Sequence, residues 1–275
     1  MTSSTLDTGT PDLLATLDAG VLTLTLNRPD ARNAMSRAMN EALQRQLAAA
    51  ELDPAVKCLV LTGAGKGFCA GGDVKGMAAR GDGTVGELTL DEAIARQRLN
   101  QRATAGKLHT CPKPTIAALP GAAAGAGLAL ALACDLRIMA SSAILTTAFA
   151  RVGFSGDYGG SYFLTQLVGT AKARELYFLS DRVGADEALR LGLVYWVCAP
   201  DELAAKTREI ALRLAAGPTV AYRYMKENLN RALAGNLDEC LDLEATHHIH
   251  CGQTEDHREA ARAFVDKREP VFKGR

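Results

Sequence analysis

The first part of the chain alternates hydrophobic and polar residues. Two runs follow this pattern, Leu13 to Leu17 and Val21 to Leu26, and Asp18-Ala-Gly20 separates them. Alternation of this kind predicts β-strands, and glycine in a short connection is typical of a hairpin turn. We therefore expect the chain to open with a β-hairpin.

A helical pattern comes next. Met39, Leu43 and Leu47 recur at the spacing of one helix face between Ser36 and Ala50. A serine in front of such a stretch caps the first turn by accepting a backbone hydrogen bond. The pattern predicts a helix over residues 36–50.

Short apolar runs lie further along the chain, at Lys57 to Leu61, Thr115 to Leu119 and Leu136 to Met139. The first leads into the glycine-rich stretch Thr62 to Gly67, and the second into Pro120-Gly121. Repeated units of strand, turn and helix indicate parallel strands with crossover connections, so the predicted fold class is α/β. Ligands of such folds gather at the loops that follow the strands.

The remaining segments are predicted mainly as helices. Residues 78–90 are rich in Gly, Asp and Thr without a period, which indicates a mobile loop, and a helix is expected over residues 91–109. From Ala171 to the end nearly every segment has a helical pattern, with breaks at Pro200-Asp201 and Gly217-Pro218. We predict a core over residues 1–200 and a C-terminal helical subdomain over residues 201–275.

Composition and charge exclude several classes of protein. The chain has 275 residues, of which 48% are hydrophobic, and its 31 basic side chains equal its 31 acidic ones. This balance gives no general attraction to nucleic acid or to an anionic membrane. No apolar run is long enough to cross a bilayer, and residues 1–10 lack the features of a targeting signal. We expect no nucleic-acid partner and no membrane.

The seven cysteines are scattered and form no CxxC pair. An odd number of thiols in apolar stretches favours reduced, buried side chains and a cytoplasmic protein. His247, His248, His250 and Cys251 offer metal-ligating atoms, and Cys251 lies on one helix face with His247. We interpret them as helix residues at a contact between subunits, and we expect no metal site.

Three segments together carry a resemblance to a known family. They are Leu26 to Ala34, Leu61 to Lys75 and Pro120 to Arg137, in this order and spacing. The chain resembles the crotonase superfamily, whose members include enoyl-CoA hydratases and isomerases. The resemblance implies a crotonase-like ββα superhelix, an acyl-CoA substrate, and a homotrimer or a dimer of trimers. It also implies that no cofactor is bound permanently, since coenzyme A arrives as part of the substrate.

The second and third segments resemble the family's oxyanion hole, in which two backbone N–H groups hold the thioester oxygen as it gains charge in an enolate. By this resemblance the donors are Gly72 and Ala126. Glycine lets the backbone approach a ligand, and Ala126 lies near the start of a predicted helix, where free N–H groups favour negative charge. Gly71, Gly72 and Gly125 could instead only permit tight turns.

Coenzyme A binding carries over from the same resemblance. Arg32 and Lys75 would supply the cations that a nucleotide needs. In relatives, residues at the positions of Phe272 and Lys273 reach the pantetheine or the phosphates, sometimes from a neighbouring subunit. The positions that would surround the adenine and the phosphates are Ala31, Arg32, Ala70, Asp73, Val74 and Lys75.

The chain departs from the hydratase pattern. Hydratases place two glutamates across the substrate double bond, and an alignment through Cys134-Asp135 puts Ala129 and Phe149 at these positions. Neither residue can transfer a proton, so hydration by such a pair is excluded if the alignment has no gap. Ala129, Phe149 and Tyr158 are expected to line the acyl pocket.

Asp157 is the predicted acid/base. It lies in Val152 to Gly160, which resembles dienoyl-CoA isomerases, in which an aspartate occupies this point, and more loosely naphthoate synthases. An apolar pocket wall would raise the pKa of this carboxyl toward the range that suits proton transfer. Ser155 and Tyr158 could assist it by hydrogen bonding. The alternative is that Asp157 only caps the following helix.

Several functions stay open. An enzyme that stabilises an enolate could isomerise a double bond or hydrate an enoyl-CoA in an atypical way, and the same hole serves thioester hydrolysis and carbon–carbon bond chemistry. A catalytically silent acyl-CoA binder is a further alternative, whereas an RNA-binding relative would call for a basic surface stripe. Acidic residues between Glu87 and Glu92 are second candidates for the base.

Overall fold

The computed structural model describes residues 3–73 and 88–275. Within them the larger sheet has the strand order β1-β2-β3-β4-β6-β8-β11, and from β3 onward each strand is parallel to its neighbour. Its strands are β1 (Ser4–Leu6), β2 (Leu13–Asp18), β3 (Val21–Leu26), β4 (Cys58–Gly63), β6 (Thr115–Leu119), β8 (Leu136–Ala140) and β11 (Trp196–Cys198).

A smaller sheet has the strand order β10-β9-β7-β5. β5, β7 and β9 are parallel, and β10 pairs with β9 in the antiparallel sense. Its strands are β5 (Gly67–Cys69), β7 (Ala122–Ala124), β9 (Ile144–Thr146) and β10 (Val183–Gly184).

Repeated pairs of strands build the two sheets. In β4 and β5, β6 and β7, and β8 and β9, the first strand joins the large sheet and the second joins the small one. α5 (Ala126–Ala133) follows the second pair, and α6 (Gly160–Leu179) follows the third. This arrangement confirms the predicted crotonase-like ββα superhelix of the α/β class.

The predicted hairpin and helix of the first fifty residues are confirmed, but the chain opens with a strand that was not predicted, β1, which pairs with β2. β2 and β3 pair in the antiparallel sense, and positive φ angles at Ala19 (50°) and Gly20 (81°) form the turn between them. α1 (Arg37–Leu52) begins directly after Ser36, whose hydroxyl accepts a hydrogen bond from the Met39 nitrogen at 3.0 Å. The β2–β3 hairpin and α1 are therefore both determined by residues close together in the sequence.

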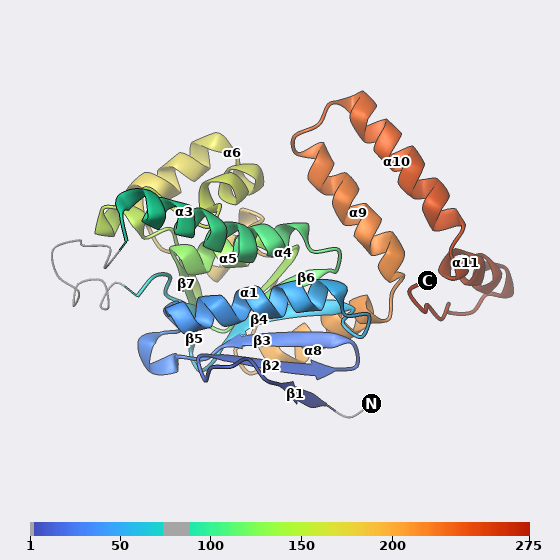
Figure 1. The fold of residues 1–275 in the computed structure, drawn as a ribbon, viewed down its shortest axis with the longest axis horizontal. Helices are drawn as coiled ribbons and strands as arrows, with labels where there is room; N and C mark the ends of the chain where they lie inside the picture. The colour runs from blue at the N-terminus through green and yellow to red at the C-terminus, as the bar shows by residue number, and fades with distance from the viewer. Residues whose placement is uncertain (1–2, 74–87) are drawn as a thin grey trace.

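Helices cover both faces of the large sheet. α1 packs on β2 and β3, and α8 (Leu203–Ala215) packs on β3, β4, β6 and β8. Figure 1 shows α1 in front of the sheet and α8 behind it. Because both faces are covered, β4 is buried along nearly its whole length, which explains its continuous apolar sequence.

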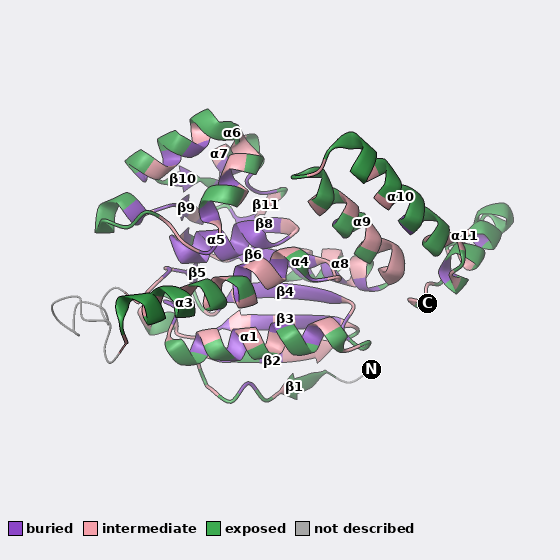
Figure 2. Ribbon diagram, turned by 45° about the horizontal axis from the view of Figure 1, so that its top comes forward, coloured by how far each residue is buried: buried purple, intermediate pink, exposed green. Residues whose placement is uncertain are grey.

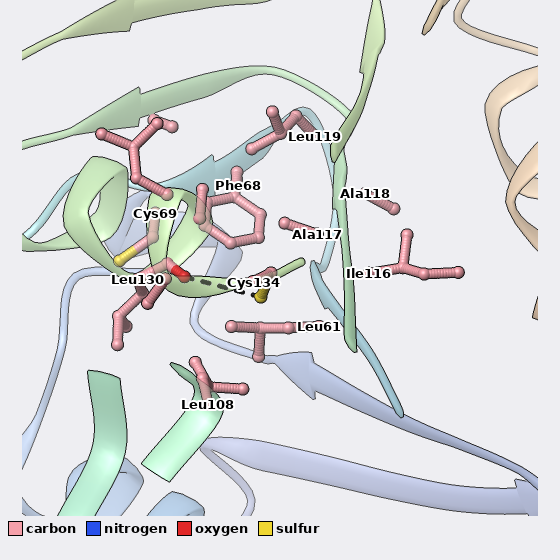
Figure 3. Close-up of a cluster of buried hydrophobic side chains, with 14 of the residues drawn as sticks. Leu61, Phe68, Cys69, Leu108, Ile116, Ala117, Ala118, Leu119, Leu130 and Cys134 are labelled. Atoms are coloured by element: carbon pink, nitrogen blue, oxygen red, sulfur yellow. Dashed lines mark hydrogen bonds between the residues drawn. The ribbon is translucent and has the colours of Figure 1, made fainter. Parts of the chain in front are cut away.

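α5 lies at the centre of the core. All eight of its residues are buried, as Figure 2 shows by its colour. Figure 3 shows the Phe68 ring among side chains from β4, β6 and α5, such as Leu61, Ala117 and Leu130. The Cys134 thiol in this cluster lies 3.5 Å from the Leu130 carbonyl oxygen. The start of α5 is thereby held firmly by packing around the whole helix.

The region before β6 is helical, as predicted. It contains α3 (Leu90–Gln101), a π-helical turn at Arg102–Gly106 and α4 (Lys107–Thr110). The predicted loop over residues 78–90 lies mostly outside the described residues. Two short 3₁₀ turns, η1 (Pro29–Ala31) and η3 (Phe149–Val152), lie near the candidate site residues in sequence.

The prediction of an almost wholly helical chain after Ala171 was wrong at two places. β10 and β11 have two and three residues, too few for a periodic pattern, and pairing with β9 and β8 determines them. The helices are α7 (Ala185–Arg190), α8, α9 (Thr219–Ala232), α10 (Leu237–Gly252) and α11 (Glu255–Asp266).

The last three helices project from the body of the molecule (Figure 1). α8, by contrast, packs on the large sheet. The division of the chain at residue 200 stays a prediction. None of the helices described is long and apolar enough to cross a membrane.

Candidate active site

Two glycine-rich segments meet where parallel strands end. β5 and β7 are neighbours in the small sheet, so the segments that follow them leave from the same edge. The Met35 nitrogen donates a hydrogen bond to the Gly71 carbonyl at 2.8 Å, and the Ala70 nitrogen donates to the Arg32 carbonyl at 3.0 Å. The segment after β5 is thereby fixed to the chain just before α1.

Gly71 leaves no room for a side chain. Its φ angle is +88°, and a Cβ atom there would lie 2.8 Å from the Ala124 oxygen and 3.2 Å from the Ala126 nitrogen. A Cβ atom on Gly127 would lie 2.4 Å from the Cys69 oxygen. Glycine is therefore required for the chain after β5 to lie directly against the start of α5.

The amides of Gly72 and Ala126 are both available as donors. Ala126 is the first residue of α5, where backbone N–H groups have no partner inside the helix. Within residues 3–73 and 88–275, neither amide donates a hydrogen bond to another group of the protein. Two such donors suit an oxygen that gains negative charge, and the helix dipole at Ala126 adds to the effect.

Asp157 lies between η3 and α6 with its carboxylate turned inward. One carboxylate oxygen, Oδ1, is buried and has no hydrogen-bond partner among the described residues. Burial raises the pKa of this carboxyl to about 6. Gly159 occupies the N-cap position of α6, and no side chain caps that helix. Helix capping therefore does not explain this carboxylate.

Tyr158 is anchored from two other helices. Its nitrogen donates to Oε1 of Gln101 at the end of α3, at 2.6 Å, and its hydroxyl accepts from Nδ2 of Asn40 in α1, at 3.1 Å. Its φ angle of 49° is unusual for a residue other than glycine. Two long-range hydrogen bonds thus hold the backbone next to Asp157 in a conformation that its own sequence does not favour.

Asp157 lies close to the segment that carries the first amide. Burial raises the pKa of the Cys69 thiol to about 12, and the nearby Asp157 carboxylate adds to the rise. The Gly71 nitrogen lies 3.4 Å from the Cys69 sulfur. The Asp157 charge is therefore felt at the residue that precedes the glycine segment with the first amide.

A cavity of about 460 Å³ opens beside this site and carries several cations. Arg32 and Ala70, two of the residues predicted to bind coenzyme A, line it. Sequence reasoning missed its other three cations, Lys66, Arg151 and Arg182, since they come from separate segments. The cavity has the charge that a nucleotide with phosphates requires.

The other predicted coenzyme A residues lie in different surroundings. Ala31 ends η1 beside Arg32. The Asp73 carboxylate lies 3.3 Å from the Arg28 guanidinium, so this carboxylate forms an ion pair within the chain. Val74 and Lys75 lie outside the described residues.

The tail residues Phe272 and Lys273 are held at α11. The buried Asp256 carboxylate accepts hydrogen bonds from the nitrogens of Lys273 and Gly274, at 2.7 and 2.9 Å. Figure 1 shows the C-terminus beside α11, far from α5 and α6. The structure does not bring these two residues to the site within one chain.

His247, one of the four candidate metal ligands on α10, contacts neighbouring side chains instead. His247 is buried, its Nδ1 lies 2.5 Å from Oδ1 of Asn228, and its ring stacks on Tyr224. In the part of the chain that the structure describes, no three His, Cys, Asp or Glu side chains are grouped so as to hold a metal ion.

Comparison with known proteins decides the family. A model of the enoyl-CoA hydratase/isomerase family matches residues 16–275. The chain belongs to the enoyl-CoA hydratase/isomerase family. It is 36% identical over 263 residues to 1,2-epoxyphenylacetyl-CoA isomerase of Escherichia coli, covering 96% of this chain and 98% of that protein. It is 34% identical over 249 residues to short-chain-enoyl-CoA hydratase of Clostridium acetobutylicum, covering 90% and 92%.

The solved structures agree with this family. The structure of an enoyl-CoA hydratase from Polaromonas sp. JS666 matches this fold with a TM-score of 0.87 and 33% identity. The match covers 95% of this chain and 99% of that one. The resemblance to the crotonase superfamily is confirmed.

Ala129 and Phe149, the residues aligned with the hydratase glutamates, are both buried. Ala129 lies on α5, three residues after Ala126, so it follows the second amide on the same side of the helix. The Phe149 ring stacks on Tyr177 of α6, with ring centres 5.8 Å apart. Sequence reasoning did not single out Tyr177, whose pKa is raised by burial and raised further by the nearby Asp157 carboxylate.

Two weaker sequence candidates do not extend the site. Ser155 is exposed. Asp91 and Glu92 are exposed in the first turn of α3, and the Glu92 carboxylate accepts hydrogen bonds from the Thr89 nitrogen and hydroxyl. Glu87 lies outside the described residues. Among the described acidic candidates for the base, Asp157 is the one with a buried carboxylate oxygen.

Proposed function

We propose that this protein isomerises a double bond in the acyl group of an enoyl-CoA thioester. The observation that supports it most strongly is the buried Asp157 Oδ1 atom, which has no hydrogen-bond partner among the described residues, together with two backbone amides that donate to no described group. An enolate enzyme needs these two parts, a base for a carbon-bound proton and donors for the oxygen that becomes charged.

In the proposed mechanism, the thioester oxygen accepts hydrogen bonds from the amides of Gly72 and Ala126. Asp157 in its carboxylate form removes a proton from the γ carbon, and the electron pair moves to the thioester oxygen to give a dienolate. Each donor stabilises this charge by roughly 3–4 kcal/mol. The protonated Asp157 then returns the proton to the α carbon, so the double bond moves by one position and the enzyme is regenerated.

Coenzyme A is proposed to bind as part of the substrate, with its phosphates at Arg32, Lys66, Arg151 and Arg182 and with the backbone at Ala70 beside its nucleotide. Ala31, Asp73, Val74 and Lys75 remain proposals for the same site from the sequence. No cofactor would be bound permanently, because the reaction needs only proton transfer.

The names of relatives point to two reactions. The E. coli relative is named an isomerase and the C. acetobutylicum relative a hydratase. Ala129 and Phe149, at the positions that we align with the hydratase glutamates, favour isomerisation, because neither side chain can activate water. Atypical hydration, thioester hydrolysis, carbon–carbon bond chemistry and silent acyl-CoA binding are the alternatives.

A panel of acyl-CoA thioesters tests the proposal. The protein would be incubated with 3-enoyl-CoA and 2-enoyl-CoA thioesters of several chain lengths. The products would be separated, and their masses would be measured by mass spectrometry. We expect interconversion without a change in mass. A gain of the mass of water would indicate hydration, release of free coenzyme A would indicate hydrolysis, and tight binding without any product would indicate a silent binder.

A homotrimer or a dimer of trimers is proposed for the assembly. Large apolar side chains are exposed on the projecting helices, among them Leu229, Leu237 and Phe264, at 69%, 73% and 86% exposure. Packing of these helices between subunits would bury them and could bring Phe272 and Lys273 to a neighbour's site. Light scattering should give three or six times the chain mass of 29.0 kDa. A monomer at micromolar concentration would contradict this assembly.

A further inference from the structure

Buried polar atoms without hydrogen-bond partners gather around Asp157. Among the described residues, four side-chain oxygens are in this state, and three of them belong to Asn40, Asp157 and Tyr177. Asn40 is hydrogen-bonded through its amide nitrogen to Tyr158, next to Asp157 in the chain. Leaving a buried polar atom unpaired costs about 1–3 kcal/mol, so such a group calls for an explanation.

The Tyr177 hydroxyl lies near Ala129, one of the residues expected to line the acyl pocket. A Cβ atom on Gly160 would lie 2.8 Å from this hydroxyl oxygen and 3.3 Å from the Cβ atom of Ala129. A Cβ atom on Gly156 would lie 3.0 Å from the tyrosine ring. The two glycines therefore give the ring its place, and the hydroxyl comes to lie beside Ala129, one helical turn from the Ala126 amide.

Tyr177 is a neutral donor in this position. Burial raises the pKa of its hydroxyl to about 12, the negative charge of Asp157 adds to the rise, and the Ser161 side chain opposes it. A phenol in this state carries one proton to donate and can also accept. A hydrocarbon acyl chain offers no partner for it, whereas an oxygen atom on the acyl chain does.

We propose that Tyr177 is a specificity-determining residue whose hydroxyl donates a hydrogen bond to an oxygen atom carried by the acyl chain. The site then takes acyl-CoA thioesters with a hydroxyl, carbonyl or ether oxygen a few carbons beyond the thioester. This inference rests on the proposed acyl-CoA function and adds the substrate class to it. Ala129 and Phe149 themselves offer no polar side-chain group to such an oxygen.

Equilibrium binding of saturated ligands tests this without any turnover. The dissociation constants of hexanoyl-CoA and of its 3-, 4- and 5-hydroxy derivatives would be measured for the wild type and for Tyr177→Phe. That variant keeps the ring stacked on Phe149 and removes only the hydroxyl. Tyr162→Phe is the matched control, since Tyr162 lies on the same helix and is 41% exposed.

We expect the wild type to bind at least one hydroxylated ligand roughly ten-fold more tightly than hexanoyl-CoA. Tyr177→Phe should abolish this preference without weakening hexanoyl-CoA, and Tyr162→Phe should keep it. Absence of any preference in the wild type, or an equal loss of affinity for all ligands in Tyr177→Phe, would overturn the inference. Failure of the wild type to bind hexanoyl-CoA at all would contradict the proposed function itself.

Discussion

Gly71 lies so close to Ala126 that a single added carbon atom would come within 3.2 Å of the Ala126 nitrogen. Gly71→Ala should therefore displace one of the two proposed donors and also strain a φ angle of +88°. Loss of one donor of this kind reduces turnover by about two to three orders of magnitude. Steady-state rates with the most active enoyl-CoA of the panel would measure the effect.

Gly252→Ala is the control for that substitution. Gly252 ends α10, and a Cβ atom there would meet nothing within 4 Å. This variant should keep wild-type turnover. If Gly71→Ala kept full turnover while remaining folded by circular dichroism, the proposed pair of donors would be wrong.

The pH dependence of the rate should follow Asp157. Burial raises the pKa of this carboxyl to about 6, and the proposed base acts only when it is ionised. We expect kcat/KM to rise with pH through about 6 and to level off above it. A profile that stays flat between pH 5 and pH 8 would not be compatible with this carboxyl as the base.

The same group should make stability depend on pH. Its pKa is raised from 3.8 to about 6 on folding, so the protonated form favours the folded state, and this contribution is lost as pH rises through that interval. Asp157→Asn cannot ionise, so the variant should be more stable than the wild type above pH 6, by roughly 1–3 kcal/mol. Urea unfolding at pH 4 and pH 7 would check that the difference appears only at the higher value.

Arg32→Ala should weaken the binding of coenzyme A thioesters. The side chain lines the cationic cavity, and removing one phosphate partner should raise Kd roughly three- to ten-fold and make binding less sensitive to salt. Calorimetric titration at two ionic strengths would measure both effects. Arg174→Ala, on the exposed side of α6, is the control. Equal affinity of the Arg32 variant and the control at low salt would remove Arg32 from the site.

The sequence predicted those parts of the fold that depend on neighbouring residues. The hairpin, α1 and β6 follow from local periodicity, and Ser36 caps α1 as expected. β10 and β11 were missed because their pairing partners lie far along the chain. Their residues show no pattern of their own.

The candidate site likewise contains some residues that the sequence could predict and others that it could not. Gly72, Ala126 and Asp157 could be named because each lies in a segment that resembles the family. Lys66 lies in a recognised segment, yet its membership of a cationic cavity depends on the pairing of β5 with β7. Tyr177 could not be predicted, since its hydroxyl lies beside Gly160 and Ala129 only because the break at Gly169 turns the second part of α6 back toward its start.

The central claim is that Asp157 moves the substrate proton while two backbone amides hold the enolate. Asp157→Asn keeps the size of the side chain and removes its capacity to accept a proton. Incubation of an enoyl-CoA in deuterated water, followed by mass spectrometry of recovered substrate and product, measures proton exchange at carbon directly. We predict that the wild type incorporates deuterium and that Asp157→Asn binds the thioester normally but exchanges at least about a hundred-fold more slowly. Exchange at the wild-type rate in the folded variant would contradict the account.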